Sequence, residues 1–533
     1  MNKELRLQDF LFSRSPSRLE LTGYTNSSEN IFRISVYRNH SFEMVEHTIS
    51  AYLDYADIRA EFLYSDYDDS LSFLHLEPES DMLILWIDFS RYSIENIDSF
   101  IQERLSYLKN IFQKPVLFCP FEKDINVSDG QVITFSMEKI KKSLGKKYKD
   151  ERLEQFSGTK MSPECALRVS KELGLSYIPA LLRPALKGII TDLDNTLYAG
   201  VLGEDGAEHV QLTEGHARLQ QKLKELSQSG FFLCVASKND KADVKDLFSR
   251  RKDFPLTAAD FAAIFASWNS KSESISAIAK FLNVHESSLL FIDDNIGELL
   301  SVKQAHPEIH LLRAYDDAHK TYDVLELYPG LLKLRMQKED ALRSDDTRAN
   351  VERRRLSESI SHESYLKQLN VELAFGINRM EDCMRVSELS NKTNQFIFNY
   401  KRYAVSAIER LVADRNAAVV TVSLKDRLSD SGIIGVAVLK KEDNEAVMEE
   451  CFVSCRALGR GLDEIIVLGA VQHGLMALNV TRLKILYQKG ERNTPALIFI
   501  NKYFCGYTDG FAEFTYLPDT ENLKITIVNG EES

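Results

Sequence analysis

Residues 188–196 read GIITDLDNT and place two carboxylates, Asp192 and Asp194, directly after a short apolar strand. Side chains two positions apart on an extended chain point to the same side, so these carboxylates are expected to converge on one cation. Magnesium prefers hard oxygen ligands and usually keeps waters and phosphate oxygens in its octahedral shell. The stretch therefore predicts a magnesium site at the end of a strand.

Strand-like and helix-like segments alternate from residue 186 to about residue 334. The expected strands cover residues 188–190, 231–236, 261–265 and 289–292, and the expected helices include 219–226, 241–249 and 271–282. Such alternation predicts a parallel sheet with helices on both faces. Sheets of this kind bind their ligands at the carboxyl ends of the strands.

Further polar groups fall at these expected strand ends. Ser237 follows the second strand and is expected to open a helix, where a hydroxyl and free N–H groups favour an anion. Lys271 starts the helix after the third strand and offers a point charge for phosphate. Asp293 and Asp294 follow the fourth strand, and if it neighbours the first, four carboxylates meet at one edge. Because clustered carboxylates repel, they require a divalent cation or a lysine.

In this order and at these places, the residues resemble the four motifs of the haloacid dehalogenase superfamily. The resemblance implies that Asp192 attacks phosphorus and becomes an aspartyl phosphate, and that Asp194 acts as general acid and base. It also implies that Thr196 and Ser237 hold the phosphoryl group while Lys271 offsets its charge. The implied magnesium ligands are Asp192, the main-chain carbonyl of Asp194, Asp293 and Asp294.

Longer stretches around these motifs resemble one family within this superfamily. They read DLDNTLYAGVLGEDGAEHVQL from residue 192, ASKND from 236, DFAAIFASWNSKSESI from 260 and LLFIDDNIGELL from 289. They are similar to the FkbH-like family, subfamily IIIC of the haloacid dehalogenases. The similarity continues through KEDALRSDDTRANVERRR, KTNQF, VSLKDRLSDSGIIGV and SCRALGRG, and it covers about residues 145 to 505.

Members of this family handle a three-carbon glyceryl unit. They take 1,3-bisphosphoglycerate, remove phosphate and load the glyceryl group as a thioester on an acyl carrier protein, for use in polyketide synthesis. The resemblance therefore implies both a phosphatase and an acyltransferase. The family usually has Trp-Gly-Gly after the first motif, whereas this chain has Tyr198-Ala199-Gly200, and this difference leaves the identity of the substrate open.

The last part of the chain, residues 365–533, is expected to be α+β with a mainly antiparallel sheet. Its segment SCRALGRG resembles the coenzyme A loop of GNAT-fold acyltransferases, where glycines let main-chain N–H groups approach a pyrophosphate. The loop residues expected to bind are Arg456, Gly459, Arg460 and Gly461. Coenzyme A or the phosphopantetheine arm of a carrier protein is the implied ligand, and an ordinary strand-to-helix turn is the alternative.

Cys455 lies directly before this loop. A helix N-terminus with Arg456 and Arg460 nearby would lower the pKa of its thiol, so Cys455 is a candidate carrier of the acyl group. A small buried hydrophobe at the end of a strand is an equal alternative. His473, on the next helix, is not expected to act as its base, because a lone helical histidine is more often filler.

The overall prediction is an α/β multidomain protein. The expected parts are an α/β domain at 1–145 without a catalytic signature, a helical connector at 146–185, the phosphatase domain at 186–334, a charged helical linker at 335–364 and a GNAT-like domain at 365–533. The first of these resembles an eroded SGNH-like or Rossmann-like fold, and an interaction or positioning role is the preferred interpretation.

Composition limits the partners. A formal net charge of −13 argues against non-specific binding to nucleic acid, and the most apolar runs are too short to span a bilayer. Seven scattered cysteines without a CxxC pair, and a start without a secretory signal, predict a cytoplasmic chain with reduced thiols.

The sequence is compatible with three functions. The first is a phosphatase coupled to acyl transfer, with a small phosphorylated substrate and an acyl carrier protein as partners. The second is a plain small-molecule phosphatase in surface-glycan or secondary-metabolite biosynthesis. The third is a carrier-docking scaffold without turnover, and the intact carboxylates speak against it.

Overall fold

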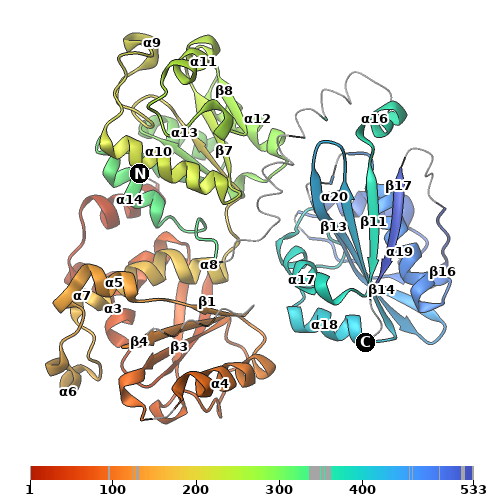
Figure 1. The fold of residues 1–533 in the computed structure, drawn as a ribbon, viewed down its shortest axis with the longest axis horizontal. Coiled ribbons are helices and arrows are strands. Elements are labelled where there is room, and N and C mark those ends of the chain that lie inside the picture. The colour runs from red at the N-terminus through yellow and green to blue at the C-terminus, as the bar shows by residue number, and fades with distance from the viewer. Residues whose placement is uncertain are drawn as a thin grey trace. The chain divides into compact units, whose positions relative to one another are not determined.

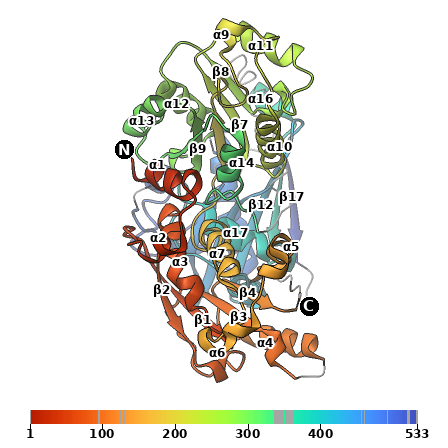
Figure 2. The ribbon, with the colours of Figure 1, turned by 90° about the vertical axis from the view of Figure 1, so that its left-hand side faces the viewer.

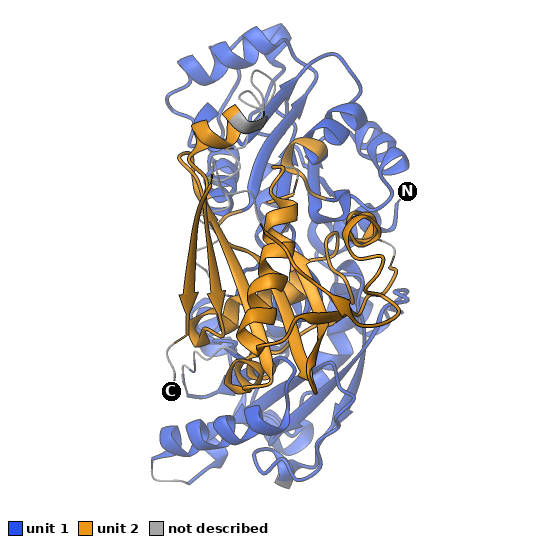
Figure 3. Cartoon of the chain, turned by 90° about the vertical axis from the view of Figure 1, so that its right-hand side faces the viewer, with its two compact units in different colours: residues 1–227, 231–279, 285–336 blue, residues 228–230, 280–284, 337–533 orange. Residues whose placement is uncertain are grey.

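The computed structural model describes residues 2–93, 96–123, 125, 127, 131–334, 349, 353, 362–454, 457, 458, 460–490, 492–517 and 523–530. The chain divides into two compact units (Figure 3), and the second consists mainly of residues 337–533. The first unit contains two parallel sheets and the second one mixed sheet, with helices between the strands (Figure 1). The predicted α/β multidomain class is therefore confirmed.

The first sheet has the strand order β2-β1-β3-β4-β5, and all neighbouring strands run parallel. Its strands are β1 (Ile31–Arg38), β2 (Arg59–Tyr64), β3 (Met82–Asp88), β4 (Val116–Phe121) and β5 (Val132–Thr134). Every residue of β3 is buried, with Ile84 and Trp86 in one apolar cluster and Leu83 and Leu85 in another. Because successive strand residues face opposite sides, both faces of this sheet are covered.

Helices cover both faces of this sheet, and they are α3 (Glu43–Tyr55), α4 (Ile97–Ile111), α5 (Glu138–Leu144), α7 (Pro163–Glu172) and α8 (Ile178–Leu182). Two further short helices of this part of the chain are α2 (Arg18–Thr22) and α6 (Glu154–Ser157). Val169 of α7 packs in the same cluster as Ile49 of α3, and Leu105 of α4 packs in the opposite cluster. The segment expected to be a connector thus contributes a helix to the core of the first sheet.

The N-terminal helix α1 (Lys3–Gln8) covers the edge of the second sheet at β10 (His310–Arg313). Gln8 is fully buried, and its side chain accepts a hydrogen bond from Arg313 N at 2.9 Å and donates one to Arg313 O at 2.8 Å. Glu4 accepts from Leu311 N at 3.1 Å. The two side chains, one helical turn apart, therefore pair with the edge strand as a neighbouring strand would.

The second sheet has the order β10-β9-β6-β7-β8 and is parallel throughout. Its other strands are β6 (Gly188–Thr191), β7 (Phe232–Ser237), β8 (Ala263–Ala266) and β9 (Leu289–Asp293). The expected strands are present, with ends that shift by one or two residues. The parallel sheet predicted from the strand–helix alternation is therefore confirmed, and β9 lies beside β6 as the site requires.

Helices lie on both faces of this sheet. They are α9 (Leu202–Asp205), α10 (Glu214–Gln228), α11 (Lys241–Arg250), α12 (Lys271–Leu282), α13 (Ile296–Ala305) and α14 (Ala318–Glu326). Figure 2 shows α10 and α11 on one side of the strands and α12 and α13 on the other. Leu219 and Leu223 of α10 are fully buried one turn apart, which is the helical periodicity that predicted this helix.

The second unit is built on a seven-stranded sheet of order β16-β15-β14-β13-β12-β11-β17. Its strands are β11 (Glu372–Ile377), β12 (Ala417–Lys425), β13 (Asp430–Glu442), β14 (Glu445–Val453), β15 (Arg482–Ile485), β16 (Ala512–Glu513) and β17 (Lys524–Asn529). Strands β11 to β14 are antiparallel, whereas β14–β15 and β11–β17 are parallel pairs. The expected mainly antiparallel sheet is therefore present.

Apolar clusters cover both faces of this mixed sheet. The helices are α16 (His362–Leu369), α17 (Cys383–Lys392), α18 (Val405–Ala413), α19 (Asp463–Leu478) and α20 (Thr494–Tyr503). Val420 of β12 packs in the cluster that contains Val471 of α19, and Val419 packs with Val386 of α17 and Ile408 of α18. No helix within the described ranges has both the length and the apolar character needed to cross a bilayer.

Candidate active site

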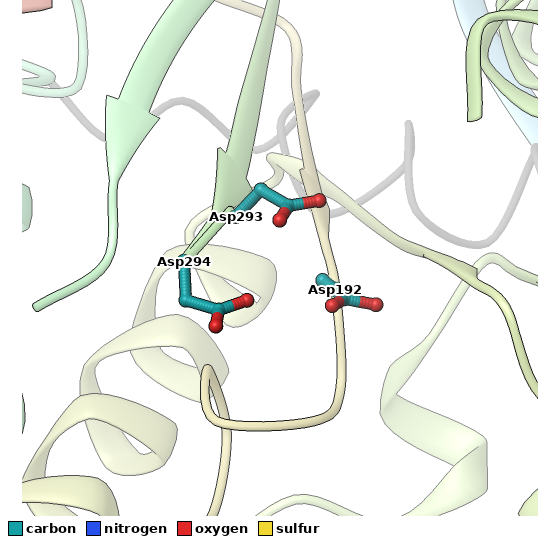
Figure 4. A group of neighbouring side chains, drawn as sticks. All are labelled: Asp192, Asp293 and Asp294. Atoms are coloured by element: carbon teal, nitrogen blue, oxygen red, sulfur yellow. The ribbon is translucent and has the colours of Figure 1, made fainter. Parts of the chain in front are cut away.

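The carboxyl edge of the second sheet gathers acidic side chains from two adjacent strands. Asp192 follows β6, Asp293 ends β9, and Asp192 N donates to Ile292 O at 2.9 Å, so the two strand ends stay in register. Ligand oxygens of Asp192, Asp293 and Asp294 all lie within 4.8 Å of one another. Figure 4 shows Asp293 and Asp294 at the end of β9 and Asp192 beside them.

Lys271, the first residue of α12, supplies the counter-charge at this edge. Its ammonium lies 2.9 Å from Asp192 Oδ2 and 2.5 Å from Asp293 Oδ2, and its side chain is only 6% exposed. Burial alone would lower the pKa of Lys271, but the carboxylates of Asp192 and Asp293 outweigh burial and raise it. The lysine therefore stays protonated in a buried position.

The three carboxylates are held where ionisation is costly. Burial raises the pKa of Asp192 and of Asp294. Burial, together with the negative charge of Asp192, raises the pKa of Asp293 to about 7. When all three are ionised, one ammonium leaves two negative charges without compensation, which is the charge of one divalent cation.

The environment of individual carboxylate oxygens also suits a magnesium ion. Asp192 Oδ1 is buried and has no hydrogen-bond partner among the described residues, and a buried oxygen of this kind needs a ligand. Asp293 Oδ1 accepts from Asn295 N at 2.9 Å, which fixes the orientation of this carboxylate. Carboxylate oxygens are the ligands that Mg²⁺ prefers, so Asp192, Asp293 and Asp294 are suited to hold it.

Asp194 does not contribute its carboxylate to this group of three. The expectation that Asp192 and Asp194 point the same way assumed an extended chain, but the chain turns here, because Leu197 N donates to Leu193 O at 2.9 Å. Asp194 Oδ1 accepts from the Tyr198 hydroxyl at 2.7 Å and from Leu202 N at 2.9 Å. The resemblance places only the Asp194 carbonyl at the metal, and that assignment stays a prediction.

The two hydroxyls expected to hold phosphate lie in buried positions near this edge. Thr196 Oγ1 is buried and has no hydrogen-bond partner in the described part of the chain. Ser237 is the last residue of β7 and accepts from Asn239 Nδ2 at 3.0 Å. Helix α11 begins only at Lys241, so the expectation that Ser237 opens a helix is wrong, because a short turn separates the strand from the helix.

The loop after β6 that contains the family difference is anchored on both sides. Ala199 and Gln211 exchange backbone hydrogen bonds of 2.9 and 2.8 Å, and Arg251 Nη1 donates to Val210 O at 2.5 Å. Gly200 has a φ of +112°, and a Cβ there would lie 2.7 Å from a carboxylate oxygen of Asp205, so only glycine fits. The backbone conformation thus explains the glycine at this position.

Tyr198, which the sequence marked only as a difference from the family, and Asn239, which it did not mark, complete the site. Tyr198 is fully buried, stacks on Phe254 at a centroid distance of 5.9 Å and donates to Asp194. Asn239 is 2% exposed and donates to both Asp194 and Ser237. Both lie inside stretches that carry the family resemblance, TLYAG and ASKND. For Asn239 that position was the only available signal, whereas Tyr198 also stood in the place of the family's tryptophan.

The candidate acyl-transfer loop lies in the second unit. Cys455, Arg456 and Gly459 lie outside the described residues, so their predicted roles stay predictions. Gly461 has a φ of +73°, a left-handed conformation that suits glycine. Arg460 is 7% exposed, and its Nη1 lies 3.2 Å from Ser431 Oγ and 3.7 Å from Asp426 Oδ2.

The described residues of this loop do not fit a diphosphate well. The Arg460 guanidinium lies against an acidic partner, and α19, which follows the loop, carries Asp463 and Glu464 in its first turn. Acidic side chains at a helix N-terminus take the place of an anionic ligand in the dipole field. His473 packs its ring on Phe375 at 4.7 Å and takes no part in the loop.

Asp426 gains a structural role that its sequence position did not reveal. Arg353 donates to both of its oxygens, at 2.8 and 2.9 Å, and both side chains are almost fully buried. Arg353 comes from the segment expected to be a solvated charged linker. This residue of the segment is instead held inside the second unit by a bidentate ion pair.

Comparison with known proteins adds three similar solved structures. The N-terminal part of the protein BF1531 from Bacteroides fragilis, which contains a phosphatase domain complexed with Mg, is 17% identical with a TM-score of 0.45, and the match covers 62% of this chain and 100% of that chain. A HAD family enzyme from Bacteroides thetaiotaomicron, in complex with magnesium and inorganic phosphate, is 11% identical with a TM-score of 0.21. The match covers 25% of this chain and 95% of that chain.

The third similar structure is that of an acetyltransferase. Ribosomal-protein-alanine N-acetyltransferase from Brucella melitensis is 11% identical with a TM-score of 0.19, covering 28% of this chain and 99% of that chain. No protein-family model matches the sequence, and no curated protein matches it either. At these values the similar structures carry no argument. The structure itself shows a parallel α/β domain with acidic side chains at the carboxyl edge of its sheet, followed in the sequence by a mixed α+β domain.

Proposed function

We propose that this chain is a magnesium-dependent phosphohydrolase with Asp192 as its nucleophile. The observation that carries the proposal is the convergence of Asp192, Asp293 and Asp294 at one sheet edge, where the Lys271 ammonium contacts the first two. Mg²⁺ held by these three carboxylates would neutralise charge on the phosphoryl oxygens. Lys271 adds a fixed positive charge in a site with little water, where electrostatic stabilisation is strongest.

The proposed reaction has two steps. A carboxylate oxygen of Asp192 bonds to phosphorus while the bond to the leaving oxygen breaks, and Asp194 gives that oxygen a proton. Water then attacks the phosphorus of the aspartyl phosphate and passes a proton to Asp194. The bond to Asp192 breaks and inorganic phosphate leaves, so both carboxyl groups return to their starting states. Thr196 and Ser237 hold the phosphoryl oxygens in both steps.

Phosphate release from small phosphate esters tests this proposal. Wild-type protein with Mg²⁺ is expected to release phosphate, and Asp192→Asn is expected to abolish release, because an amide cannot form the aspartyl phosphate. Asp253→Asn, which changes an exposed carboxylate outside the site, is the matched control and should keep full activity. An Asp192→Asn protein that hydrolyses at the wild-type rate would contradict the assignment of the nucleophile.

We further propose, from the FkbH-like resemblance, that the substrate is 1,3-bisphosphoglycerate or a similar acyl phosphate and that the acceptor is the thiol of an acyl carrier protein. The phosphate ester would be hydrolysed at Asp192 and would consume one water. The thiol would attack the acyl carbon, release the second phosphate and form the thioester. Support for this second activity comes from the resemblance of the SCRALGRG segment to GNAT-fold loops and from the mixed α+β sheet.

A plain phosphatase is the second candidate, and the position of Arg460 favours it. The Arg460 guanidinium points at Asp426 and Ser431 inside the protein, so the described loop offers little to a carrier's phosphate. For the coupled-transfer candidate, we therefore assign no role to coenzyme A.

One assay separates these candidates. Protein, Mg²⁺, 1,3-bisphosphoglycerate and a holo carrier protein are incubated, and phosphate release is followed together with the mass of the carrier. Phosphate with carrier acylation supports coupled transfer, phosphate alone supports the plain phosphatase, and neither product points to a docking scaffold. If an acyl adduct on the protein survives Cys455→Ala, Cys455 is not the acyl carrier.

A further inference from the structure

The carboxylate of Asp194 is fixed by three hydrogen bonds from three places in the chain. Oδ1 accepts from the Tyr198 hydroxyl at 2.7 Å and from Leu202 N at 2.9 Å, and Oδ2 accepts from Asn239 Nδ2 at 2.8 Å. Both oxygens are therefore engaged, and rotation of the side chain would break these bonds. A carboxylate with this many donors has one preferred orientation.

The two side-chain donors are themselves held rigidly. Tyr198 is fully buried and stacks on Phe254 with an angle of 28° between the rings. Asn239 is 2% exposed, and the same amide nitrogen that reaches Asp194 lies 3.0 Å from Ser237 Oγ. Asn239 thus links the candidate acid/base group to the hydroxyl that is expected to hold phosphate. Support of this kind keeps reacting groups within the narrow range of useful geometries.

We propose that Tyr198 and Asn239 are positioning residues that aim Asp194 at the leaving oxygen. The proposal rests on the proposed phosphohydrolase function, in which Asp194 protonates that oxygen. The proposal also gives a role to Tyr198, the residue at which this chain differs from the family pattern. The tyrosine in the place of the usual tryptophan is buried and binds Asp194 through its hydroxyl, so its contact is with the acid/base group rather than with solvent.

The dependence of the rate on the leaving group distinguishes positioning from a purely structural role. An alkyl phosphate such as glycerol 2-phosphate releases a strongly basic alkoxide that needs a proton in the transition state. Acetyl phosphate releases acetate, a weak base that leaves without one. Only the first substrate depends on a well-aimed general acid, whereas a weakened fold would slow both substrates equally.

The experiment compares kcat/KM for these two substrates in the full-length protein with Mg²⁺. This constant reports the transfer of phosphate to Asp192 and excludes the later hydrolysis of the aspartyl phosphate, which both substrates share. Tyr198→Phe and Asn239→Leu are expected to lower kcat/KM for glycerol 2-phosphate by about 10- to 100-fold. For acetyl phosphate, the expected loss is less than about 3-fold.

Gln220→Leu is the matched control. Gln220 is fully buried, and its amide donates to Leu197 O at 2.8 Å, so it anchors the same loop without touching Asp194. This variant loses a buried hydrogen bond of the same kind. It is expected to change kcat/KM for both substrates by the same factor.

The possible outcomes separate the inference from the proposed function. Equal losses for both substrates in Tyr198→Phe and Asn239→Leu would overturn the positioning role and leave the phosphohydrolase intact. Unchanged rates for both substrates would overturn it as well. If the wild-type protein hydrolyses neither substrate while it remains folded and binds Mg²⁺, the proposed function fails and the inference fails with it.

Discussion

The Lys271 ammonium lies 2.9 Å from Oδ2 of Asp192, and it simultaneously contacts Asp293 on the neighbouring strand. One buried cation thus holds together carboxylates from two strand ends. Removing one member of a buried ion pair leaves an uncompensated charge, and this is far more costly than the loss of a surface pair.

Lys271→Met should therefore destabilise the metal-free protein. With EDTA at pH 8, we expect the free energy of unfolding to fall by about 3 kcal/mol, and Mg²⁺ should restore part of the loss. Chemical denaturation with and without the metal measures both effects. The control is Lys245→Met, an exposed change on α11 that should cost no more than about 0.5 kcal/mol. Equal stability of Lys271→Met and the wild type in EDTA would contradict the prediction.

Magnesium should stabilise the first unit through Asp294. At a Mg²⁺ concentration 100-fold above the dissociation constant, binding adds about 2.7 kcal/mol to the free energy of unfolding, and a melting curve detects this gain. Asp294→Asn removes one anionic ligand and should require more Mg²⁺ for the same gain. Asp253→Asn should respond like the wild type. An Asp294→Asn protein with unaltered magnesium dependence would exclude Asp294 from the site.

The buried ion pair of Arg353 and Asp426 should stabilise the second unit. Asp426→Asn leaves the Arg353 guanidinium buried without its full partner and should cost about 3 to 5 kcal/mol. A double-mutant cycle with Arg353→Met measures the coupling, and the two changes together should cost less than the sum of the single ones. The exposed pair of Lys524 and Glu372 serves as the control cycle and should show little coupling. Strict additivity for Arg353 and Asp426 would disprove the pair's role.

His40 should make the first sheet sensitive to acid. It is fully buried between the rings of Trp86 and Phe121, and burial, followed by the charges of Arg91 and Arg38, holds its pKa well below the usual value. Below about pH 6.5, the unfolded chain therefore binds a proton that the folded chain does not. The free energy of unfolding should fall with decreasing pH, by at most about 1.4 kcal/mol per pH unit from this group.

Urea unfolding between pH 5 and pH 8 measures this dependence. His40→Phe keeps an aromatic ring in the stack and should remove the contribution, whereas His209→Gln, a change at an exposed histidine, should retain it. Both variants remove one histidine, which is buried at position 40 and exposed at position 209. If the free energy of unfolding depends on pH in His40→Phe as it does in the wild type, groups other than His40 cause this dependence.

Part of the site followed from the sequence because backbone topology determines it. The carboxyl ends of neighbouring parallel strands must meet, so DLDNT after β6 and the Asp293–Asp294 pair after β9 come together once the strands are adjacent. Lys271 reaches both because its helix begins at the same edge. The alternating segments predict the strands and their parallel sheet, whereas the adjacency of β6 and β9 was a condition that the structure meets.

The orientation of single side chains could not be predicted in the same way. Asp194 turns towards Tyr198 and Asn239, and the second of these comes from 45 positions further along the chain. Arg460 lies against Asp426, 34 positions before it. Such partners depend on packing in three dimensions, and neither residue spacing nor periodicity encodes them.

The most direct test of the central claim is a crystal structure of the protein grown with Mn²⁺ in place of Mg²⁺. The anomalous difference map identifies the metal independently of any assumption about its ligands. We predict a peak among the carboxylates of Asp192, Asp293 and Asp294, beside Lys271. A strong peak elsewhere, with no density between these three side chains, would contradict the proposed metal site and the chemistry built on it.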